Sequence, residues 1–335
     1  MKGVIQTKTS TGSVAAEETS HGFPAALDPR EAQLAGHAKH PSLFWQLSEL
    51  FKARVTILVV LTAIAGFALG AHHTTQPFFT TQLLTSIIGV GLFACCAAAL
   101  NEILERRQDA QMLRTRNRPL PALHMSLTQA WAWTVISGVA AFVVLARGND
   151  LLTAILGMAT TLSYALVYTP LKRITTLSTF IGAFPGAMPA CLGWVAATGR
   201  VSAEFWALFA IQFFWQFPHF LAIAWIYRED YSRAGIRMLP VVDDSGIKTA
   251  SQMLFAGLLL IPASLFPYWL GMTTLIYVPI AVLLGIGYLT FGVKLAMLGV
   301  GPASPESKRY ARNVLKASVL YLPLLLILLV ATGRG

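Results

Sequence analysis

Charged side chains are scarce in this chain, because Asp, Glu, Lys and Arg make up only 12% of its 335 residues while 55% are hydrophobic. A soluble domain carries about 25% charged residues. The shortage of charge therefore excludes the ordinary soluble globular class. Apolar runs near the roughly 20-residue length that spans a bilayer recur along the chain instead. Such runs cross lipid as helices, so the composition predicts an all-α polytopic membrane protein.

Cysteine is also scarce, and the three cysteines all lie inside apolar runs. The odd count and the lack of metal-ligand spacing exclude a disulfide framework and a cysteine metal site. We therefore expect Cys95, Cys96 and Cys191 to serve as small apolar packing residues.

The N-terminal segment lacks the long apolar run that a signal peptide needs. Its acidic residues and its few arginines argue against a mitochondrial presequence. Residues 1–42 are polar and are expected to form a disordered cytoplasmic tail. The aromatic and basic residues of 41–54 predict an interfacial helix. Residues 43–335 then form one transmembrane domain.

Nine apolar runs have the length of a membrane span, at about 54–72, 83–104, 127–147, 150–170, 178–198, 204–226, 251–271, 274–294 and 314–332. All but three of the 25 Lys and Arg either precede the first span or follow an even-numbered one. The positive-inside rule then predicts a cytoplasmic N-terminus and an outside C-terminus. The net charge of +10 therefore reports membrane topology, and we expect no nucleic-acid partner.

The second span ends in a row of polar residues, and ionisable groups at a membrane boundary are costly enough to suggest function. Asn101, Glu105 and Asp109 are four residues apart, so a helix places them on one face. Amide and carboxylate oxygens suit Mg²⁺, which also binds phosphates. A solvated helix end with i,i+4 charge pairs is the alternative. The basic residues that follow are Arg106, Arg107, Arg114, Arg116 and Arg118.

Two further polar groups lie at the same predicted rim. Tyr168, Lys172 and Arg173 end the fourth span and either clamp phosphate oxygens or anchor the helix in the interface. A second acidic region follows the sixth span and includes Tyr227, Glu229, Asp230 and Tyr231. Acids for a divalent cation and bases for an anion together predict a site for a diphosphate with a lipid tail.

The sixth span contains His219 beside Pro218 among several aromatic residues. A proline frees backbone groups inside a helix. The histidine is either a ligand for a substrate or a hydrogen-bonded structural residue. The aromatic rings either pack or stabilise a carbocation. Loss of diphosphate in a dry pocket would give an allylic cation that water cannot quench, so we expect prenyl transfer to an acceptor inside the bundle.

These motifs resemble those of a known family. Asn101-x3-Glu105-x3-Asp109 is similar to the first aspartate-rich motif of the UbiA superfamily of intramembrane prenyltransferases, and 168–173 and 227–243 are similar to its Tyr…Lys-Arg element and second acidic region. Within the superfamily, three runs resemble the protohaem IX farnesyltransferases, namely Met112-x-Arg114-Thr-x2-Arg-Pro-Leu-Pro, Pro218-His219-Phe220 and Tyr227-Arg-Glu-Asp-Tyr-x2-Ala-Gly-Ile-x-Met-Leu-Pro-Val. The resemblance covers about 44–333.

The resemblance implies nine helices around a central cavity open toward lipid, in a prenyltransferase domain spanning 43–335. It implies Mg²⁺-dependent farnesyl transfer from farnesyl diphosphate to a vinyl group of haem B, with addition of water to give haem O for haem-copper oxidases. The implied metal ligands and catalytic residues are Asn101, Glu105 and Asp109. The implied diphosphate residues are Arg114, Arg118, Tyr168, Lys172 and Arg173, with His219 for haem. A bacterial inner membrane is the expected location, and haem A synthase or an oxidase subunit the expected recipient.

The chain departs from the superfamily pattern in two places. Glu105 stands where most members have aspartate, and Tyr227 and Tyr231 stand at the spacing where many have aspartates. A second Mg²⁺ site is therefore less expected than the first. Two alternatives stay open: an aromatic acceptor of the kind used in quinone synthesis, and a transporter. Transporters place charges near the membrane midplane, whereas these charges gather at one rim.

Overall fold

The computed structural model describes residues 41–334, so the tail expected at 1–42 lies outside the described residues except for its last two. Within this part of the chain, nine helical segments are long and apolar enough to cross a membrane. Six of these segments are single helices whose bounds lie close to the predicted spans: α3 Ala53–Thr74, α4 Thr81–Asp109, α5 Leu127–Gly148, α10 Ala203–Ile226, α13 Ile247–Trp269 and α14 Tyr277–Ala296. The predicted all-α architecture with nine spans is confirmed.

The other three spans differ from the prediction. Two of them consist of more than one helical segment, and the third is longer than its apolar run. The fourth combines α6 Leu151–Leu162, the π-helical turn η1 Ser163–Tyr168 and α7 Thr169–Leu171. The fifth is broken at Ala187 into α8 Ser178–Gly186 and α9 Met188–Thr198, beside Pro185 and Pro189. The ninth, α15 Pro305–Ala331, begins well before the predicted 314 because its polar first turns are also helical.

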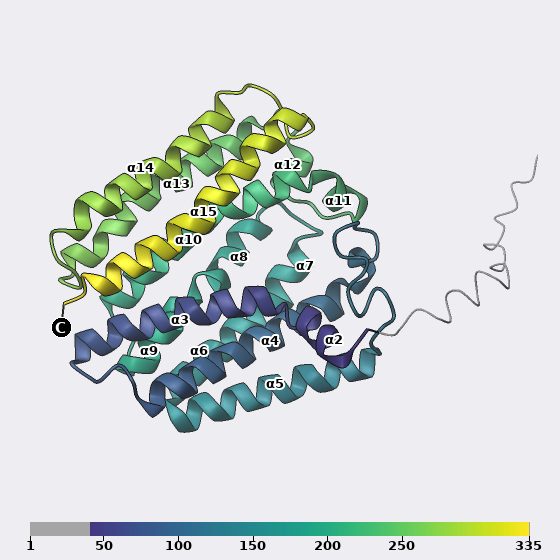
Figure 1. Ribbon diagram of the computed structural model, residues 1–335. Coiled ribbons are helices and arrows are strands. Elements are labelled where there is room, and N and C mark those ends of the chain that lie inside the picture. Colours follow the sequence, from purple (N-terminus) through teal and green to yellow (C-terminus); the bar gives the residue numbers. More distant parts are fainter. Residues whose placement is uncertain (1–40, 335) are drawn as a thin grey trace, which may run out of the picture. The chain divides into compact units, whose positions relative to one another are not determined.

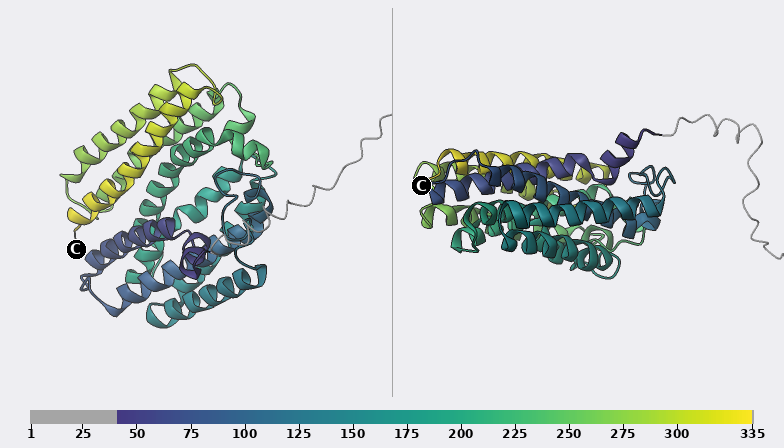
Figure 2. Two further views of the ribbon diagram at one scale, coloured as in Figure 1. Left: turned by 45° about the vertical axis from the view of Figure 1, so that its right-hand side comes forward. Right: turned by 90° about the horizontal axis from the view of Figure 1, so that it is seen from below.

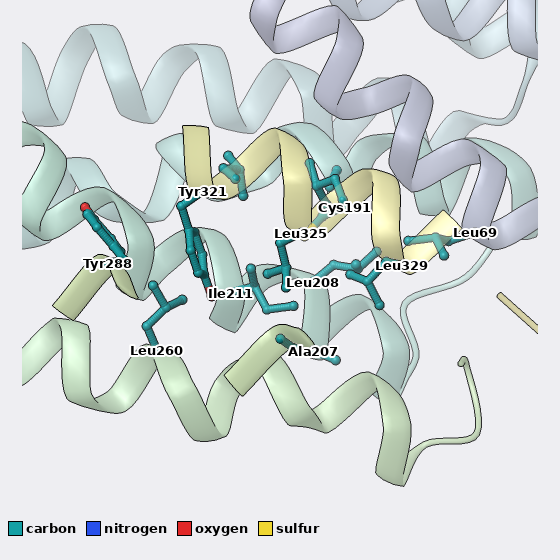
Figure 3. Close-up of a cluster of buried hydrophobic side chains, with 14 of the residues drawn as sticks. Leu69, Cys191, Ala207, Leu208, Ile211, Leu260, Tyr288, Tyr321, Leu325 and Leu329 are labelled. Carbon is teal, nitrogen blue, oxygen red and sulfur yellow. The ribbon is translucent and has the colours of Figure 1, made fainter. Parts of the chain in front are cut away.

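The helices run alongside one another, with α10, α13, α14 and α15 grouped together and α3, α4, α5, α6 and α9 forming the neighbouring group (Figures 1 and 2). The largest buried cluster lies among α9, α10, α13, α14 and α15, where Leu208, Ile211 and Leu325 are almost fully enclosed (Figure 3). Cys191 belongs to this cluster, and all three cysteines are free, as expected for packing residues. Many large apolar side chains elsewhere face outward, which suits a bundle solvated by lipid.

Small residues allow α3 and α9 to touch backbone to backbone. A Cβ atom added at Gly66 would lie 1.9 Å from the carbonyl oxygen of Ala190. A Cβ atom added at Gly193 would lie 1.9 Å from the carbonyl oxygen of Ala63. Close approach through glycine is the usual way in which membrane helices associate, because lipid supplies little hydrophobic drive between them. This crossing holds the first span against the fifth.

The basic loops meet at one end of the bundle, together with α2 Leu43–Leu50, α11 Arg228–Arg233 and α12 Leu239–Val242 (Figure 1). The amide of Leu113 donates to Asp230, and the amide of Arg237 donates to the carbonyl of Lys172 at 2.7 Å. Loops that follow the second, fourth and sixth spans are thereby connected. The shared rim is as predicted, while the side of the membrane that it faces stays a prediction.

The interfacial segment is helical only in its first part. The Ser42 side chain caps α2 by accepting from the amide of Trp45. The chain then turns at Lys52, whose φ of +47° lies in the left-handed region that few non-glycine residues adopt. The predicted interfacial helix is therefore shorter than 41–54, and the turn directs Lys52 away from its helix.

Replacing Gly193 with valine should separate α3 from α9 and lower the free energy of unfolding by about 1–3 kcal/mol, the usual effect of overpacking. Thermal unfolding of the purified protein in detergent measures this change. Gly287→Val is the matched control, because nothing lies within 4 Å of a Cβ atom there. Equal melting temperatures for the two variants would contradict the proposed crossing.

Candidate active site

The polar face of α4 is buried. Asn101 and Asp109 are each 1% exposed and Glu105 is 9% exposed. The Asn101 amide nitrogen donates to Glu105 Oε2 at 2.9 Å, so the predicted shared face is real. A solvated helix end would leave these groups in water, and that alternative is therefore wrong.

Each member of the triad meets a cation from a different segment. Arg118 Nη1 lies 2.8 Å from Asp109 Oδ2, and Lys172 Nζ lies 2.9 Å from Glu105 Oε1. Burial opposes the charged form of Lys172, but Tyr168 and Glu105 beside it raise its pKa. Buried carboxylates need such partners, because an unpaired buried charge is strongly destabilising.

The π-helical turn η1 brings the Tyr168 region to α4. Lys172 Nζ lies 4.6 Å from the centroid of the Tyr168 ring, within cation–π range. Thr169, one residue further, accepts from the Asn101 amide at 3.2 Å. Gly182 of α8 is needed here, since a Cβ atom would approach the Tyr168 ring to 2.5 Å. π-Helical turns of this kind often mark functional sites.

Lys52 is a member of the cluster that the sequence interpretation missed. Its Nζ donates to Asn101 Oδ1 at 2.5 Å. Burial, followed by the charge of Arg118, lowers the pKa of Lys52 to about 7. In the sequence this lysine cannot be distinguished from other basic residues that precede a first span. Its side chain reaches Asn101 because the backbone makes a left-handed turn at this position.

Glu102 was also missed, because it lies one residue away from the predicted face. It is fully buried, and its Oε1 accepts from the amide of Leu120 at 3.2 Å. This bond fixes the loop that carries Arg118 against α4. Its Oε2 has no hydrogen-bond partner within the described residues.

The second acidic region contacts the loop that follows α4 through its tyrosines. The Arg114 guanidinium lies 5.1 Å from the Tyr227 ring centroid and 6.0 Å from the Tyr231 ring centroid. Arg114 also donates to the Tyr231 hydroxyl at 3.4 Å. Asp230 accepts from Leu113 and from Arg233. Arg114, Tyr227, Asp230 and Tyr231 are therefore together, as predicted.

Three other residues of this rim contact groups outside the face of Asn101, Glu105 and Asp109. Glu229 is half exposed and pairs with Lys308 of α15 at 2.7 Å. Arg173 is exposed. Its Nη1 donates to the Gln108 amide oxygen at 3.3 Å, in the Gln108 orientation that gives both the oxygen and the nitrogen of that amide a hydrogen bond. Asp243 has a structural role: burial opposes its ionisation, yet hydrogen bonds from Thr249 lower its pKa and cap α13.

The donor set of α4 fits a hard divalent cation. Among residues 41–334, no three His, Cys, Asp or Glu side chains form a metal-binding group. The predicted set instead combines one amide with two carboxylates, all oxygen donors of the kind that Mg²⁺ prefers. Asp109 Oδ1 is buried and has no hydrogen-bond partner in the described part of the chain. A buried acceptor without a partner is costly, and a bound cation would satisfy it.

His219 lies on α10 and contacts α15. Its Nδ1 is 2.8 Å from Ser318 Oγ, and that oxygen is 2.6 Å from the carbonyl of Leu315. The single hydroxyl proton goes to the carbonyl, so Nδ1 carries hydrogen and Nε2 keeps its lone pair. Trp215 stacks on the imidazole at 5.0 Å between centroids and donates to the Ser318 carbonyl. The histidine is therefore structurally anchored through Nδ1.

The remaining aromatics of α10 pack on one another. Phe213 contacts Phe209, Phe217 and the rings of α8 at centroid distances below 6 Å. Trp225 is buried and donates to Ser307 at 3.0 Å. These contacts favour the packing interpretation over stabilisation of a carbocation.

The UbiA prenyltransferase family model matches residues 59–331, which is most of the chain and contains nearly every residue of the cluster. The chain belongs to the UbiA prenyltransferase family. The α4 cluster consists of Asn101, Glu105 and Asp109 with their partners Lys52, Lys172 and Arg118. Of these residues only Lys52 lies outside the matched range. This UbiA-family chain is a multi-pass membrane protein.

Two similar curated proteins carry the same name. The Protoheme IX farnesyltransferase of Koribacter versatilis is 45% identical over 284 residues, which cover 85% of this chain and 92% of that protein. The Protoheme IX farnesyltransferase of Solibacter usitatus is 45% identical and covers 83% of this chain and 94% of its own length.

Solved structures share the fold of this UbiA-family chain. A digeranylgeranylglyceryl phosphate synthase aligns with a TM-score of 0.69 at 18% identity over 86% of this chain and 98% of that one. A UbiA homolog from Archaeoglobus fulgidus, bound to DMAPP and Mg²⁺, aligns with a TM-score of 0.61 at 13% identity over 85% of this chain and 99% of that one.

A double-mutant cycle tests the buried pair of this UbiA-family chain. Glu105→Gln and Lys172→Met should show a coupling of about 1–3 kcal/mol in unfolding free energy, because each change alone leaves a buried charge without its partner. The exposed pair Glu229 and Lys308 is the matched control, with coupling below about 1 kcal/mol. Similar coupling in both pairs would show that the α4 face is solvated.

Proposed function

We propose that this UbiA-family chain transfers the farnesyl group of farnesyl diphosphate to a vinyl group of haem B, with addition of water, giving haem O. The main observation behind this proposal is the buried face of α4 at the membrane rim. There Asn101, Glu105 and Asp109 contact Lys52, Lys172 and Arg118, respectively. Two relatives at 45% identity are named protoheme IX farnesyltransferase, which supports farnesyl as the transferred group and haem as the acceptor.

The reaction balances as a substitution followed by hydration. The C1–O bond of farnesyl diphosphate breaks and its electron pair leaves with diphosphate. C1 then bonds to one vinyl carbon, water adds to the other, and one proton is released. The rim residues serve the first part, since the diphosphate stays in the headgroup region while the farnesyl chain lies in apolar surroundings that exclude water.

The basic residues have a double role in this proposal. Asn101, Glu105 and Asp109 would hold Mg²⁺, which supplies neutralisation of the diphosphate leaving group. Lys52, Lys172 and Arg118 now contact those same oxygens. Ammonium and guanidinium groups also bind phosphate strongly, so these three side chains would turn to the diphosphate oxygens on binding. The aromatic faces of Tyr168 and Tyr227 keep Lys172 and Arg114 near the site.

His219 would hold the acceptor through Nε2. The bond to Ser318 fixes the tautomer and ring orientation, as the outer partners of metal-bound histidines commonly do. A histidine held in this way suits a porphyrin iron better than a small aromatic acid. The expected setting is a bacterial inner membrane, where haem A synthase or an oxidase subunit would receive the product.

Membranes containing the protein, incubated with farnesyl diphosphate, Mg²⁺ and haem B, should yield a haem whose mass has increased by one farnesyl group and one hydroxyl group. EDTA should stop the reaction. Asp109→Asn should lower turnover at least 100-fold, of the order lost when a group that stabilises developing charge is removed. Glu229→Gln is the control and should keep near-normal turnover, because that side chain faces Lys308. Prenylation of an aromatic acid with haem unchanged, or full activity in EDTA, would refute the proposal.

Haem binding should depend on His219 and Ser318. His219→Ala should weaken haem B binding about 10-fold or more and change its Soret spectrum, while farnesyl diphosphate binding stays the same. Ser318→Ala should weaken haem B binding less than His219→Ala does. Ser318→Thr should bind haem B as the wild type does, because threonine keeps the hydroxyl. A rise in KM for the diphosphate alone would remove the haem role of His219.

A further inference from the structure

A groove of about 570 Å³ lies on the bundle between α14 and α15, outside the α4 cluster. Its lining residues come from the end of α14 and the start of α15: Phe291, Lys294, Met297, Leu298, Arg309, Tyr310 and Asn313. None of the α4 residues or of the 110–126 loop lines it. The groove is therefore separate from the proposed diphosphate site.

The groove lies at the same end of the bundle as the basic rim. Lys308, next to Arg309, pairs with Glu229 of the second acidic region. The loop between α14 and α15 packs there as well, since a Cβ atom added at Gly301 would lie 2.0 Å from the carbonyl of Asp244. The membrane-spanning part of α14 ends at Ala296. The groove is thus at the level where hydrocarbon meets headgroups.

The two cations of the groove have no anionic partner within the part of the chain that the structure describes. Within residues 41–334, Lys294 and Arg309 form no ion pair and no side-chain hydrogen bond, although Lys294 lies 5.8 Å from the Phe291 ring centroid. Glu306, the one acid on the first turn of α15, makes no ion pair with Arg309. Arg312 and Lys316 add positive charge further along the same helix. Because both cations line the same groove, one anion bound there would be attracted to both of them.

The rest of the lining is amphipathic. Met297 is 81% exposed, and Phe291 and Leu298 add apolar surface beside the lysine. The Tyr310 hydroxyl and the Asn313 amide supply polar atoms on the facing helix. Basic pockets between membrane helices with this composition bind anionic lipid headgroups. A free phosphate would use only the cations, whereas a phospholipid would also cover the apolar residues.

We propose that this groove binds the headgroup of an anionic glycerophospholipid. Arg309 and Lys294 hold the phosphodiester, Asn313 and Tyr310 contact the polar headgroup, and an acyl chain covers Phe291 and Leu298. The bound lipid fixes the end of α14 against α15, the helix whose Lys308 contacts the second acidic region. The site is independent of the chemistry on α4.

Native mass spectrometry of the purified protein with phosphatidylglycerol or phosphatidylcholine tests this site. The wild type should retain one phosphatidylglycerol at least about 10-fold more tightly than phosphatidylcholine, the factor expected for charge-assisted hydrogen bonds. The double variant Lys294→Gln and Arg309→Gln should lose that preference. Millimolar inorganic phosphate should leave the bound lipid in place.

The matched control removes the same charge from the same region. Arg312→Gln combined with Lys316→Gln should keep the preference within about 2-fold, because neither residue lines the groove. Lys294→Arg should also keep it. Equal loss in the control would show general attraction to anionic lipid and overturn the site. Displacement by inorganic phosphate, or equal retention of phosphatidylcholine, would overturn it as well.

Discussion

The structure depends on one constraint: Glu105 and Asp109 are buried at the end of a membrane helix, and each of these two carboxylates is matched by a cation. Lys52 comes from the turn before the first span, Arg118 from the loop after the second, and Lys172 from the end of the fourth. Because an unmatched buried carboxylate is so costly, the pairs of Asp109 and Glu105 draw the segments of Arg118 and Lys172 to α4, and Lys52 joins them through the Asn101 amide oxygen. When a prenyl diphosphate binds, Mg²⁺ would contact the oxygens of α4, and the cations that now contact those oxygens would pair with the diphosphate.

The neighbouring elements are arranged around this constraint. Glu102 fixes the loop that carries Arg118. The π-helical turn and the open space at Gly182 let Tyr168 lie against Lys172. The second acidic region contacts the loop that follows α4, where Tyr227 and Tyr231 hold Arg114 and Asp230 accepts from Leu113. Its contribution is therefore to position a base, which agrees with the tyrosines that stand where many superfamily members have aspartates.

Much of the fold could be predicted, because hydropathy and the length of a bilayer set the number of spans. The i,i+4 spacing of Asn101, Glu105 and Asp109 likewise predicted a shared face. Lys52 and Ser318 could not be found this way, since a basic residue before a span and a serine within one are both common. Their roles arise from a left-handed turn and from a contact between α10 and α15. The partner of Glu229 was equally hidden, because Lys308 belongs to helical turns beyond the predicted ninth span.

The chemistry proposed for α4 can be observed directly in a crystal. Diffraction from the protein with Mn²⁺ in place of Mg²⁺ and an unreactive thio analogue of farnesyl diphosphate would locate the metal by its anomalous signal. We expect the metal to contact Asp109 and Asn101, with Lys172 and Arg118 turned to the diphosphate. A metal bound only within 227–243, with the pairs of Glu105 and Asp109 unchanged, would contradict it.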